Sequence, residues 1–385
     1  MEPKKSTLEN LEVINANYID MKNNFNVILE KDLNYIINNC RGDLNYLSNK
    51  KVLYTGGGGF LGYYFTSAIQ KWNCISFNKK ISLTILDNFF IRVPKWLNKI
   101  KDKNIFIIKN NINNLNNSFF NKFDIIIHGA SVASPSYYRK FPIETMEANV
   151  MGLWKILNSY KKLSIKKNKK KVLFFFSSSE VYGDPPSKYI PTNEDYNGNV
   201  SFVGPRACYD ESKRFGETLV LNYAKKFKFK AKIARPFNNY GPGMDINDKR
   251  LIPDIIQNIL KKKDIHIYSD GYPTRTFCYV ADAIIGYIKL LTKGKNLSSY
   301  NIGSDQNEIS VYNLAKLLKS ISYKMINYKG KIIRKMSKDS DYLNDNPNRR
   351  KPDLKKSYKD LNFKSKILLK NGLHNTLHYF LNYKD

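Results

Sequence analysis

Cysteine and histidine are scarce in this chain of 385 residues, which contains four of each. The cysteines are scattered, with no CxxC pair and no partner at metal-ligand spacing. One histidine pair, His374 and His378, is a helical turn apart, but two ligands without a third make a poor metal site. We therefore expect reduced thiols, no disulfide framework and no bound metal. The cysteines are Cys40, Cys74, Cys208 and Cys278.

Long apolar runs are also missing. The run VLFFF at 172–176 is typical of the chain and far shorter than the roughly 20 residues that span a bilayer. The N-terminal stretch MEPKKSTLENLEVINANYID lacks the apolar block of a signal peptide. We expect a soluble, cytoplasmic protein with no membrane partner.

Acidic residues are few relative to basic ones, 33 against 64, which gives a formal net charge of +31. Such an excess suggests a nucleic-acid partner. The lysines, however, are spread along the whole chain among many Asn, Ile, Tyr and Phe residues, a mixture expected from codon usage biased toward A and T. We therefore expect no nucleic-acid partner, although the positive field would also attract small polyphosphate ligands.

Short β-rich apolar runs make up the first half of the chain after an initial extension. KVLYTG, ISLTILD, NIFIIK, FDIIIHGA, KVLFFFSS and KAKIARP are apolar without alternation, several with room for a helix between them. Continuous hydrophobicity indicates strands buried on both faces, hence an α/β fold with a doubly wound parallel sheet. We expect three parts: a helical extension over 1–47, a dinucleotide-binding domain over 48–236, and a smaller lobe over 237–385. Within that lobe, a segment at about 277–300 returns to the first domain.

A glycine-rich loop follows the first expected strand. Gly56, Gly59 and Gly62 are spaced G-x-x-G-x-x-G between a strand and a helix, where backbone without Cβ atoms can approach a pyrophosphate. The second strand ends in Asp87, whose carboxylate could accept hydrogen bonds from the adenosine ribose. That acid favours NAD over NADP, while Arg92 nearby points the other way. The alternative is a glycine-rich turn without a ligand.

Tyr209 and Lys213 are one helical turn apart in GPRACYDESKR and would share a face. A nearby ammonium stabilises a phenolate, so the tyrosine could take a proton from an alcohol as its hydride leaves. In isolation, such a pair is more often two neighbours on a helix. Ser177 to Glu180 follow another strand, at the sheet edge where doubly wound folds bind ligands.

These features together resemble the extended short-chain dehydrogenase/reductases that act on nucleotide sugars, a family with a Rossmann-type fold. The resemblance rests on the glycine loop, the YxxxK pair, HGAS at 128–131, Asn149 and RPFNNYGPG at 235–243, and it covers roughly residues 50–380. Within the family, SEVYGDP, GPRACYDESKR, PTRTFCYVADA and NPNRRKPD are most similar to UDP-glucuronate decarboxylases, the UDP-xylose synthases. The 4,6-dehydratases carry Thr-Asp-Glu where this chain has Ser178-Ser179-Glu180.

The resemblance implies a mechanism. Tyr209 would deprotonate the sugar 4-hydroxyl as hydride passes to NAD, and the C5 carboxylate, then β to a ketone, would leave as CO2 before the hydride returns to C4. Glu180 and Arg275 would orient the carboxylate and manage protons at C5, since an arginine fork matches a carboxylate. The implied catalytic residues are Tyr209, Lys213, Ser178, Ser179, Glu180 and Arg275.

The resemblance also implies the binding residues. For the substrate, the choice between Arg349 and Arg350 stays open. The cofactor residues would be Gly56, Gly59, Phe60, Leu61, Gly62, Asp87, Asn111, Ile112, Ala130, Asn149, Tyr209 and Lys213, and the substrate residues Tyr138, Glu180, Asn238, Arg250, Arg275, Arg349 and Arg350.

Several functions remain open at this point. Ser178 where the family usually has threonine, and Asn111 where it often has aspartate, fit a sister family that acts on another nucleotide sugar. The near alternatives are a nucleotide-sugar 4-epimerase and a 4,6-dehydratase, and the distant one is a non-catalytic, RNA-binding dehydrogenase-like protein. By resemblance we expect a homodimer formed through a four-helix bundle that includes the helices carrying Asn149 and Tyr209.

Overall fold

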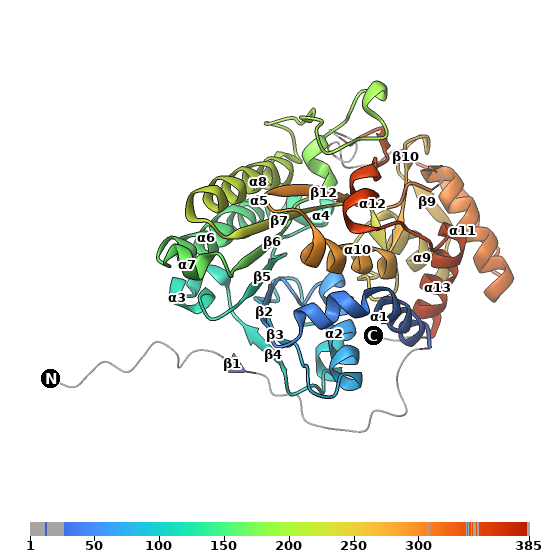
Figure 1. Ribbon diagram of the computed structural model, residues 1–385. Helices are drawn as coiled ribbons and strands as arrows, with labels where there is room; N and C mark the ends of the chain where they lie inside the picture. The colour runs from blue at the N-terminus through green and yellow to red at the C-terminus, as the bar shows by residue number, and fades with distance from the viewer. Residues whose placement is uncertain are drawn as a thin grey trace.

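A β-sheet runs through the middle of the molecule, with helices on both faces (Figure 1). The computed structural model describes residues 12–13, 27–306, 308–335, 337, 339, 341, 344 and 346–382. The sheet has eight strands in the order β1-β4-β3-β2-β5-β6-β7-β12, and all but β1 are parallel. The strands are β1 (Glu12–Val13), β2 (Lys51–Thr55), β3 (Ser82–Asp87), β4 (Ile105–Lys109), β5 (Ile125–His128), β6 (Val172–Phe176), β7 (Lys230–Pro236) and β12 (Ser298–Ile302).

The central strands are buried on both faces, which explains their unbroken apolar sequences. All five residues of β6 are buried, with Phe174 and Phe176 in one core and Leu173 and Phe175 in the other. The strand order reverses between β2 and β5, and such a reversal opens a crevice at the carboxyl ends of the strands. The doubly wound parallel fold expected from the sequence is confirmed.

Two helical layers cover the sheet (Figure 1). One core lies under α1 (Val27–Leu47), α2 (Phe60–Ile75) and α10 (Val280–Lys293). The other lies under α3, α6 and α8, of which α8 is the helix that contains Tyr209 and Lys213. The helices on this side are α3 (Asn117–Phe120), α4 (Pro135–Lys140), α5 (Pro142–Met146), the π-helical turn η3 (Glu147–Gly152), α6 (Leu153–Lys161), α7 (Ile165–Asn168) and α8 (Ala207–Phe227).

Helix α1 is an integral part of the first layer. Its apolar face is buried against α2 and α10, and it carries two buried carboxylates, Asp32 and Asp43. Asp32 accepts hydrogen bonds from the hydroxyls of Tyr64 on α2, at 2.8 Å, and Tyr279, at 2.7 Å. The extension expected over 1–47 thus contains a helix, but Glu12–Val13 pair as a strand with β4, and residues 1–11 and 14–26 lie outside the described part.

The chain beyond Pro236 builds a smaller lobe from short strands and helices, and it also returns to the main sheet. Helix α10 and strand β12 complete the parallel sheet beside β7. Three small sheets lie in this part, with orders β13-β10-β15, β11-β8 and β14-β9. Their strands are β8 (Asn239–Tyr240), β9 (Ile265–Ile267), β10 (Thr274–Arg275), β11 (Cys278–Tyr279), β13 (Ile309–Ser310), β14 (Ile332–Arg334) and β15 (Arg349–Arg350).

The remaining α-helices lie in the smaller lobe, and the 3-10 turns lie in connections between the earlier strands and helices. Helices α9 and α11 precede and follow α10 in the sequence. They and their neighbours are α9 (Leu251–Leu260), α11 (Val311–Ile326), α12 (Lys355–Leu361) and α13 (Leu369–Asn382), and the 3-10 turns are η1 (Lys95–Lys99), η2 (Ile112–Asn114), η4 (Ser179–Tyr182) and η5 (Ser187–Tyr189).

Neither a membrane span nor a metal cluster is found within the described residues. None of their helices combines the length and the apolar character needed to cross a bilayer. No group of three His, Cys, Asp or Glu side chains among them is arranged to hold a metal ion. All four cysteines are free thiols.

Candidate active site

A cavity of about 400 Å³ lies at the carboxyl ends of β2, β3, β4 and β5. Its walls are the loops that follow these strands, together with residues 243–250 of the smaller lobe. A crevice at this edge of a doubly wound sheet is where such folds bind ligands. Of the residues expected to bind cofactor or substrate, it is lined by Gly56, Gly59, Phe60, Asp87, Asn111, Ile112, Ala130 and Arg250.

The glycine loop forms one wall of the cavity and tolerates no side chain at its tightest points. Gly56 has a φ of +72°, and a Cβ there would lie 2.5 Å from the Cα of Ala130. A Cβ on Gly62 would collide with the carbonyl oxygen of Gly57, so α2 can begin close to the loop only because glycine stands there. This backbone forms the cradle that a pyrophosphate needs.

Asp87 lies at the end of β3, next to the glycine loop. Its Oδ2 accepts a hydrogen bond from the N–H of Gly58 at 2.9 Å, and its Oδ1 accepts one from the N–H of Phe89 at 2.8 Å. Burial raises the pKa of this carboxyl, while the backbone donors lower it. The two bonds fix the carboxylate beside the glycine loop, and each oxygen keeps a lone pair for a ligand hydroxyl.

Some residues expected at the cofactor lie behind the cavity wall. Leu61 and Gly62 are in the first turn of α2, and Leu61 packs against the core. Asn149 is completely buried in η3, and its side-chain N–H donates to Ser212 Oγ on α8 at 2.8 Å. The structure therefore places Asn149 between two helices, next to the face of α8 that carries Tyr209.

Tyr209 and Lys213 share one face of α8, as the spacing predicts. The Lys213 ammonium lies 5.6 Å from the centre of the Tyr209 ring and donates to the Phe176 carbonyl oxygen at 2.9 Å. The Tyr209 hydroxyl is hydrogen-bonded to Ser178. Ser178 also accepts the N–H of Glu180 at 3.2 Å, so the end of β6 presents its hydroxyl to the tyrosine, with Ser179 buried beside it.

Burial shifts the pKa of both groups against ionisation. Desolvation raises the pKa of Tyr209 to about 12, although its hydrogen bond to Ser178 and the charge of Arg250 lower it. Desolvation also lowers the pKa of Lys213 to about 7. Both shifts favour the neutral phenol and the neutral amine, and they move the two pKa values further apart than in exposed groups.

Glu180 is held between two arginines from different parts of the chain. Its Oε2 accepts from Arg206 Nη2 and from Arg350 Nη2, each at 2.5 Å, and its Oε1 accepts from Arg350 Nη1 at 2.5 Å. Burial alone would raise the pKa of Glu180, but Arg206 and Arg350 outweigh it and lower the pKa to about 2. Glu180 is therefore a carboxylate across the neutral range.

Arg275 lies beside this cluster but bonds only to oxygens of uncharged groups. Its side chain donates to the carbonyls of Thr274 at 2.8 Å, Asn348 at 3.1 Å and Pro347 at 2.5 Å, with a weak contact to Asn346. Within the described residues it forms no ion pair with an acid. Burial, followed by the charge of Arg350, lowers its pKa to about 9. The site thus contains a buried guanidinium without a direct counter-ion.

The geometry separates the two neighbouring arginines of β15. Arg350 reaches Glu180, whereas Arg349 is partly exposed and pairs with Glu308 at 2.8 Å. Alternating side chains along a strand account for the difference. Of the two, only Arg350 lies at the candidate site.

Of the other expected substrate residues, Tyr138 and Arg250 lie near Tyr209. The Tyr138 ring stacks on that of Tyr209, with centroids 5.0 Å apart and planes 16° apart. Arg250 lines the cavity and pairs with Asp248. Asn238, in a left-handed conformation with φ of +36°, donates to the Thr276 carbonyl oxygen at 2.9 Å.

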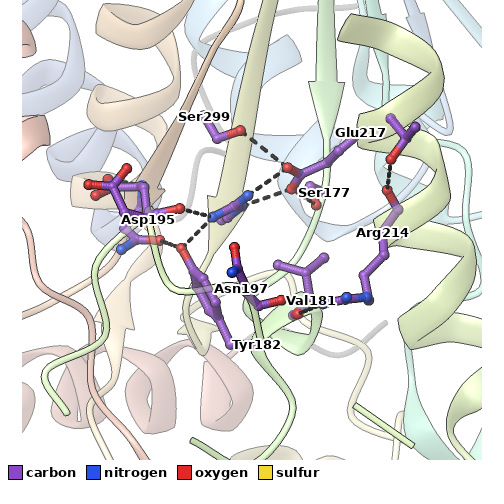
Figure 2. Close-up of polar contacts among 12 residues, drawn as sticks. Ser177, Val181, Tyr182, Asp195, Asn197, Arg214, Glu217 and Ser299 are labelled. Carbon is purple, nitrogen blue, oxygen red and sulfur yellow. Dashed lines mark hydrogen bonds and ion pairs between the residues drawn. The ribbon is translucent and has the colours of Figure 1, made fainter. Parts of the chain in front are cut away.

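Two features of this region were missed by sequence reasoning. Arg206 and Asp210 stand in the same stretch as Tyr209, and the i,i+4 spacing of an arginine and an aspartate was the available signal. The second feature is the buried pair of Glu217 and Arg235. Figure 2 shows Ser177 and Ser299 directed toward Glu217, with Tyr182 on the other side of the network.

The comparisons with known proteins agree with this geometry. The family model described as "NAD dependent epimerase/dehydratase family" matches residues 52–303, which cover more than half of the chain. The chain belongs to this family. The expected resemblance to nucleotide-sugar enzymes of the extended short-chain dehydrogenase/reductase type is thereby confirmed.

Relatives within the epimerase/dehydratase family include two decarboxylases. UDP-glucuronic acid decarboxylase 1 of Xenopus tropicalis is 34% identical over 342 residues, covering 88% of this chain and 73% of the relative. UDP-glucuronic acid decarboxylase 6 of Arabidopsis thaliana is 32% identical over 332 residues, covering 85% and 88%.

Solved structures of the family have the same fold. UDP-glucose 4-epimerase from Thermotoga maritima, with UDP-glucose, superposes with a TM-score of 0.72 at 23% identity, covering 86% of this chain and 98% of that one. UDP-glucuronic acid 4-epimerase from Bacillus cereus, in complex with UDP-glucuronic acid and NAD, gives 0.69 at 22% identity, covering 86% and 99%.

Proposed function

We propose that this chain is a UDP-glucuronate decarboxylase that forms UDP-xylose. The observation that carries the proposal is Arg275, a buried guanidinium beside Glu180 that has no acidic partner within the described residues. An unpaired buried charge is costly, so such a site is built for an anionic ligand group. A sugar carboxylate at C5 would supply that charge. The decarboxylase relatives support the same reading.

The residues that line the cavity have the chemical character needed to bind NAD. Gly56 and Gly59 would lie against the pyrophosphate, and Asp87 would accept hydrogen bonds from the adenosine ribose hydroxyls. Asn111, Ile112 and Ala130 complete the wall on the side of the adenine and the nicotinamide. NAD held in this position would supply an acceptor, and later a donor, of hydride for C4 of the sugar.

The proton transfer at C4 belongs to the groups at the end of β6 and on α8. Tyr209 takes the proton of the 4-hydroxyl, and Ser178 donates a hydrogen bond that steadies the same oxygen. Lys213 keeps its ammonium 5.6 Å from the tyrosine ring and stabilises the phenolate as it forms. Oxidation at C4 makes the C5 carboxylate a β-keto acid, whose carbon–carbon bond can break with the electrons entering an enolate. The enolate then takes up a proton at C5, which restores the 4-ketone before C4 is reduced again.

The carboxylate that leaves is held by Arg275. The positive charge of its guanidinium would attract that carboxylate, because no acidic side chain among the described residues pairs with it. Glu180 lies next to it as an anion and accepts hydrogen bonds, since two arginines hold its pKa near 2. Release of neutral CO2 removes the anion from Arg275 and lets the product leave. Arg250, Asn238, Tyr138 and Arg350 would bind the remaining nucleotide and sugar groups.

Product analysis tests this function. The purified protein, with NAD supplied, is incubated separately with UDP-glucuronate, UDP-glucose and dTDP-glucose, and the products are identified by mass spectrometry and NMR. We expect loss of CO2 from UDP-glucuronate and a UDP-pentose product. An unchanged mass with inversion at C4 would identify a 4-epimerase, and loss of water from a neutral sugar a 4,6-dehydratase; either result refutes the proposed function.

We further propose that two copies associate through α5, η3, α6 and α8. These helices expose large apolar side chains, among them Ile143 at 59%, Met151 at 57% and Phe215 at 45% exposure. Pairing of this face with its counterpart in a second copy would form a four-helix bundle and remove these side chains from water. Sedimentation of the protein and of Met151→Glu tests it: a dimer that the substitution dissociates is expected, and a monomeric wild type overturns it.

A further inference from the structure

Arg206 occupies the N-terminal cap of α8, three residues before Tyr209. Its side chain is buried, with 8% exposure, although no role for it follows from the family motifs. A buried arginine so close to the candidate base needs a physical reason, because removing a guanidinium from water is costly.

Arg206 contacts two residues of the candidate site, Glu180 and Tyr138. Arg206 Nη2 donates to Glu180 Oε2 at 2.5 Å, and its guanidinium carbon lies 5.7 Å from the centre of the Tyr138 ring. That ring is the one stacked on Tyr209. On its other side, Nε lies 3.6 Å from Asp210 Oδ2. One side chain thus contacts the carboxylate of Glu180, proposed to act at C5, and the Tyr138 ring, which stacks on the proposed base for C4.

Pairing alone does not account for this arginine. Arg350 already gives Glu180 two hydrogen bonds and one full positive charge. Around Arg206, by contrast, three buried polar atoms lack a hydrogen-bond partner within the described residues: its own Nε, Asp210 Oδ1 and the Tyr138 hydroxyl. A purely structural ion pair normally satisfies the groups that surround it. The cluster is therefore arranged for ligand groups that complete it.

We propose that Arg206 is a positioning residue, which fixes the Glu180 carboxylate and presses the Tyr138 ring onto Tyr209. The proposal rests on the proposed roles of Glu180 and Tyr209. Glu180 is held by α8 on one side and by β15 of the smaller lobe on the other, so loss of Arg206 leaves the carboxylate attached only to the lobe. Burial raises the pKa of Glu180, and in the variant one guanidinium instead of two would oppose this rise.

The test compares Arg206→Met, Arg206→Lys and the control Arg214→Met. Arg214 is on the same helix, but it bonds to the carbonyls of Val181 and Asn197 and has no contact with Glu180. The pH dependence of kcat and kcat/KM is measured for each variant with UDP-glucuronate, alongside thermal unfolding.

For Arg206→Met we expect kcat to fall about 100-fold, as for a misplaced catalytic group. We also expect the acid limb of its pH profile to move upward by at least one unit, because Glu180 becomes easier to protonate. Arg206→Lys should restore the acid limb, since it keeps the charge, but not the full kcat, since it lacks the planar fork. Arg214→Met should match the wild type in both.

The outcomes separate this inference from the proposed function. An active wild type and an Arg206→Met variant with an unchanged acid limb overturn the positioning role and leave the decarboxylase standing. A wild type that converts another nucleotide sugar refutes the decarboxylase, and the same comparison of pH profiles with that sugar decides the role of Arg206. If Arg206→Lys also fails to fold, the residue is structural and the inference is wrong.

Discussion

Two buried acid–arginine clusters lie near the carboxyl end of β6 and differ in how fully their polar groups are paired. Glu217 accepts both Nε and Nη2 of Arg235, at 2.8 and 2.7 Å, together with the hydroxyls of Ser177 and Ser299. Arg235 also donates to the Tyr182 hydroxyl. No buried polar atom of Glu217 or Arg235 is left without a partner within the described residues.

The Glu180 cluster has the same ingredients and a different balance. Arg206, Asp210 and Tyr138 each keep an unpaired buried atom, and Arg275 has no acidic partner among the described residues. Burial, then the nearby Glu180 charge, raises the pKa of Asp210 to about 8. The polar groups of Glu217 and Arg235 are paired without a ligand, whereas the Glu180 cluster keeps unpaired atoms, which supports the proposed ligand site there.

The largest effect is expected when two buried tyrosines are compared, Tyr209 near the Glu180 cluster and Tyr182 in the Glu217 cluster. Tyr209→Phe removes the proposed base, and turnover should fall by about 10³-fold or more with the fold intact. Tyr182→Phe removes a hydroxyl that donates to Asn301 Oδ1 and accepts from Arg235, so it should cost about 1–3 kcal/mol of stability and change turnover only a few-fold. Steady-state kinetics measure the turnover of the two variants, and chemical denaturation measures their stability. Equal losses of turnover would show that the two tyrosines do not differ in function.

The second prediction compares how much stability the protein loses when each of two buried arginines is replaced. Arg235→Met leaves the buried Glu217 carboxylate without its counter-ion and should lower the free energy of unfolding by about 3–5 kcal/mol. Arg275→Met removes a charge that has no direct counter-ion, so we expect a cost of no more than about 2 kcal/mol, together with loss of decarboxylation. Urea denaturation of both variants decides between them, and a larger cost for Arg275→Met would show that Arg275 is a structural residue.

The smallest expected effect is that Lys213 makes the free energy of unfolding depend on pH in the protein without NAD. Burial lowers the pKa of Lys213 from 10.5 to about 7, so between these values the unfolded chain holds one more proton than the folded one. The free energy of unfolding should therefore rise with pH over this window, by at most about 1.4 kcal/mol per unit. Below pH 7 the lysine is charged in both states and its burial is fully destabilising.

Lys213→Met isolates this contribution. The variant should be more stable than the wild type near pH 6.5, and the advantage should shrink toward pH 9.5 as the wild-type lysine loses its proton on folding. Denaturation curves of both proteins at several pH values measure the difference. Parallel curves across this range would show that the ammonium is not desolvated in the free protein.

Much of the fold could be predicted because the buried strands carry unbroken apolar sequences. Strand β6 is all Val, Leu and Phe, whereas β12 begins with two serines and was expected only as part of a returning segment. The two-residue strands β10 and β15 are too short for any periodicity to reveal them. Their register nevertheless decides that Arg275 and Arg350 lie side by side.

The candidate site was predictable where one local pattern carries both partners. Tyr209 and Lys213 are such a case, as is the glycine loop. The sequence left the choice between Arg349 and Arg350 open, because it depends on which face of β15 meets Glu180, 170 positions away in the chain. Contacts between distant segments arise from packing, which local spacing does not encode.

Helix α1 has a practical consequence for anyone who produces this protein. The family-matched segment begins at residue 52, so α1 lies entirely outside it. A gene shortened to that segment would encode a protein whose α2 and α10 present a bare apolar surface to water, with the hydroxyls of Tyr64 and Tyr279 deprived of Asp32. Such a product should collect in inclusion bodies, and the boundary for expression belongs ahead of Val27.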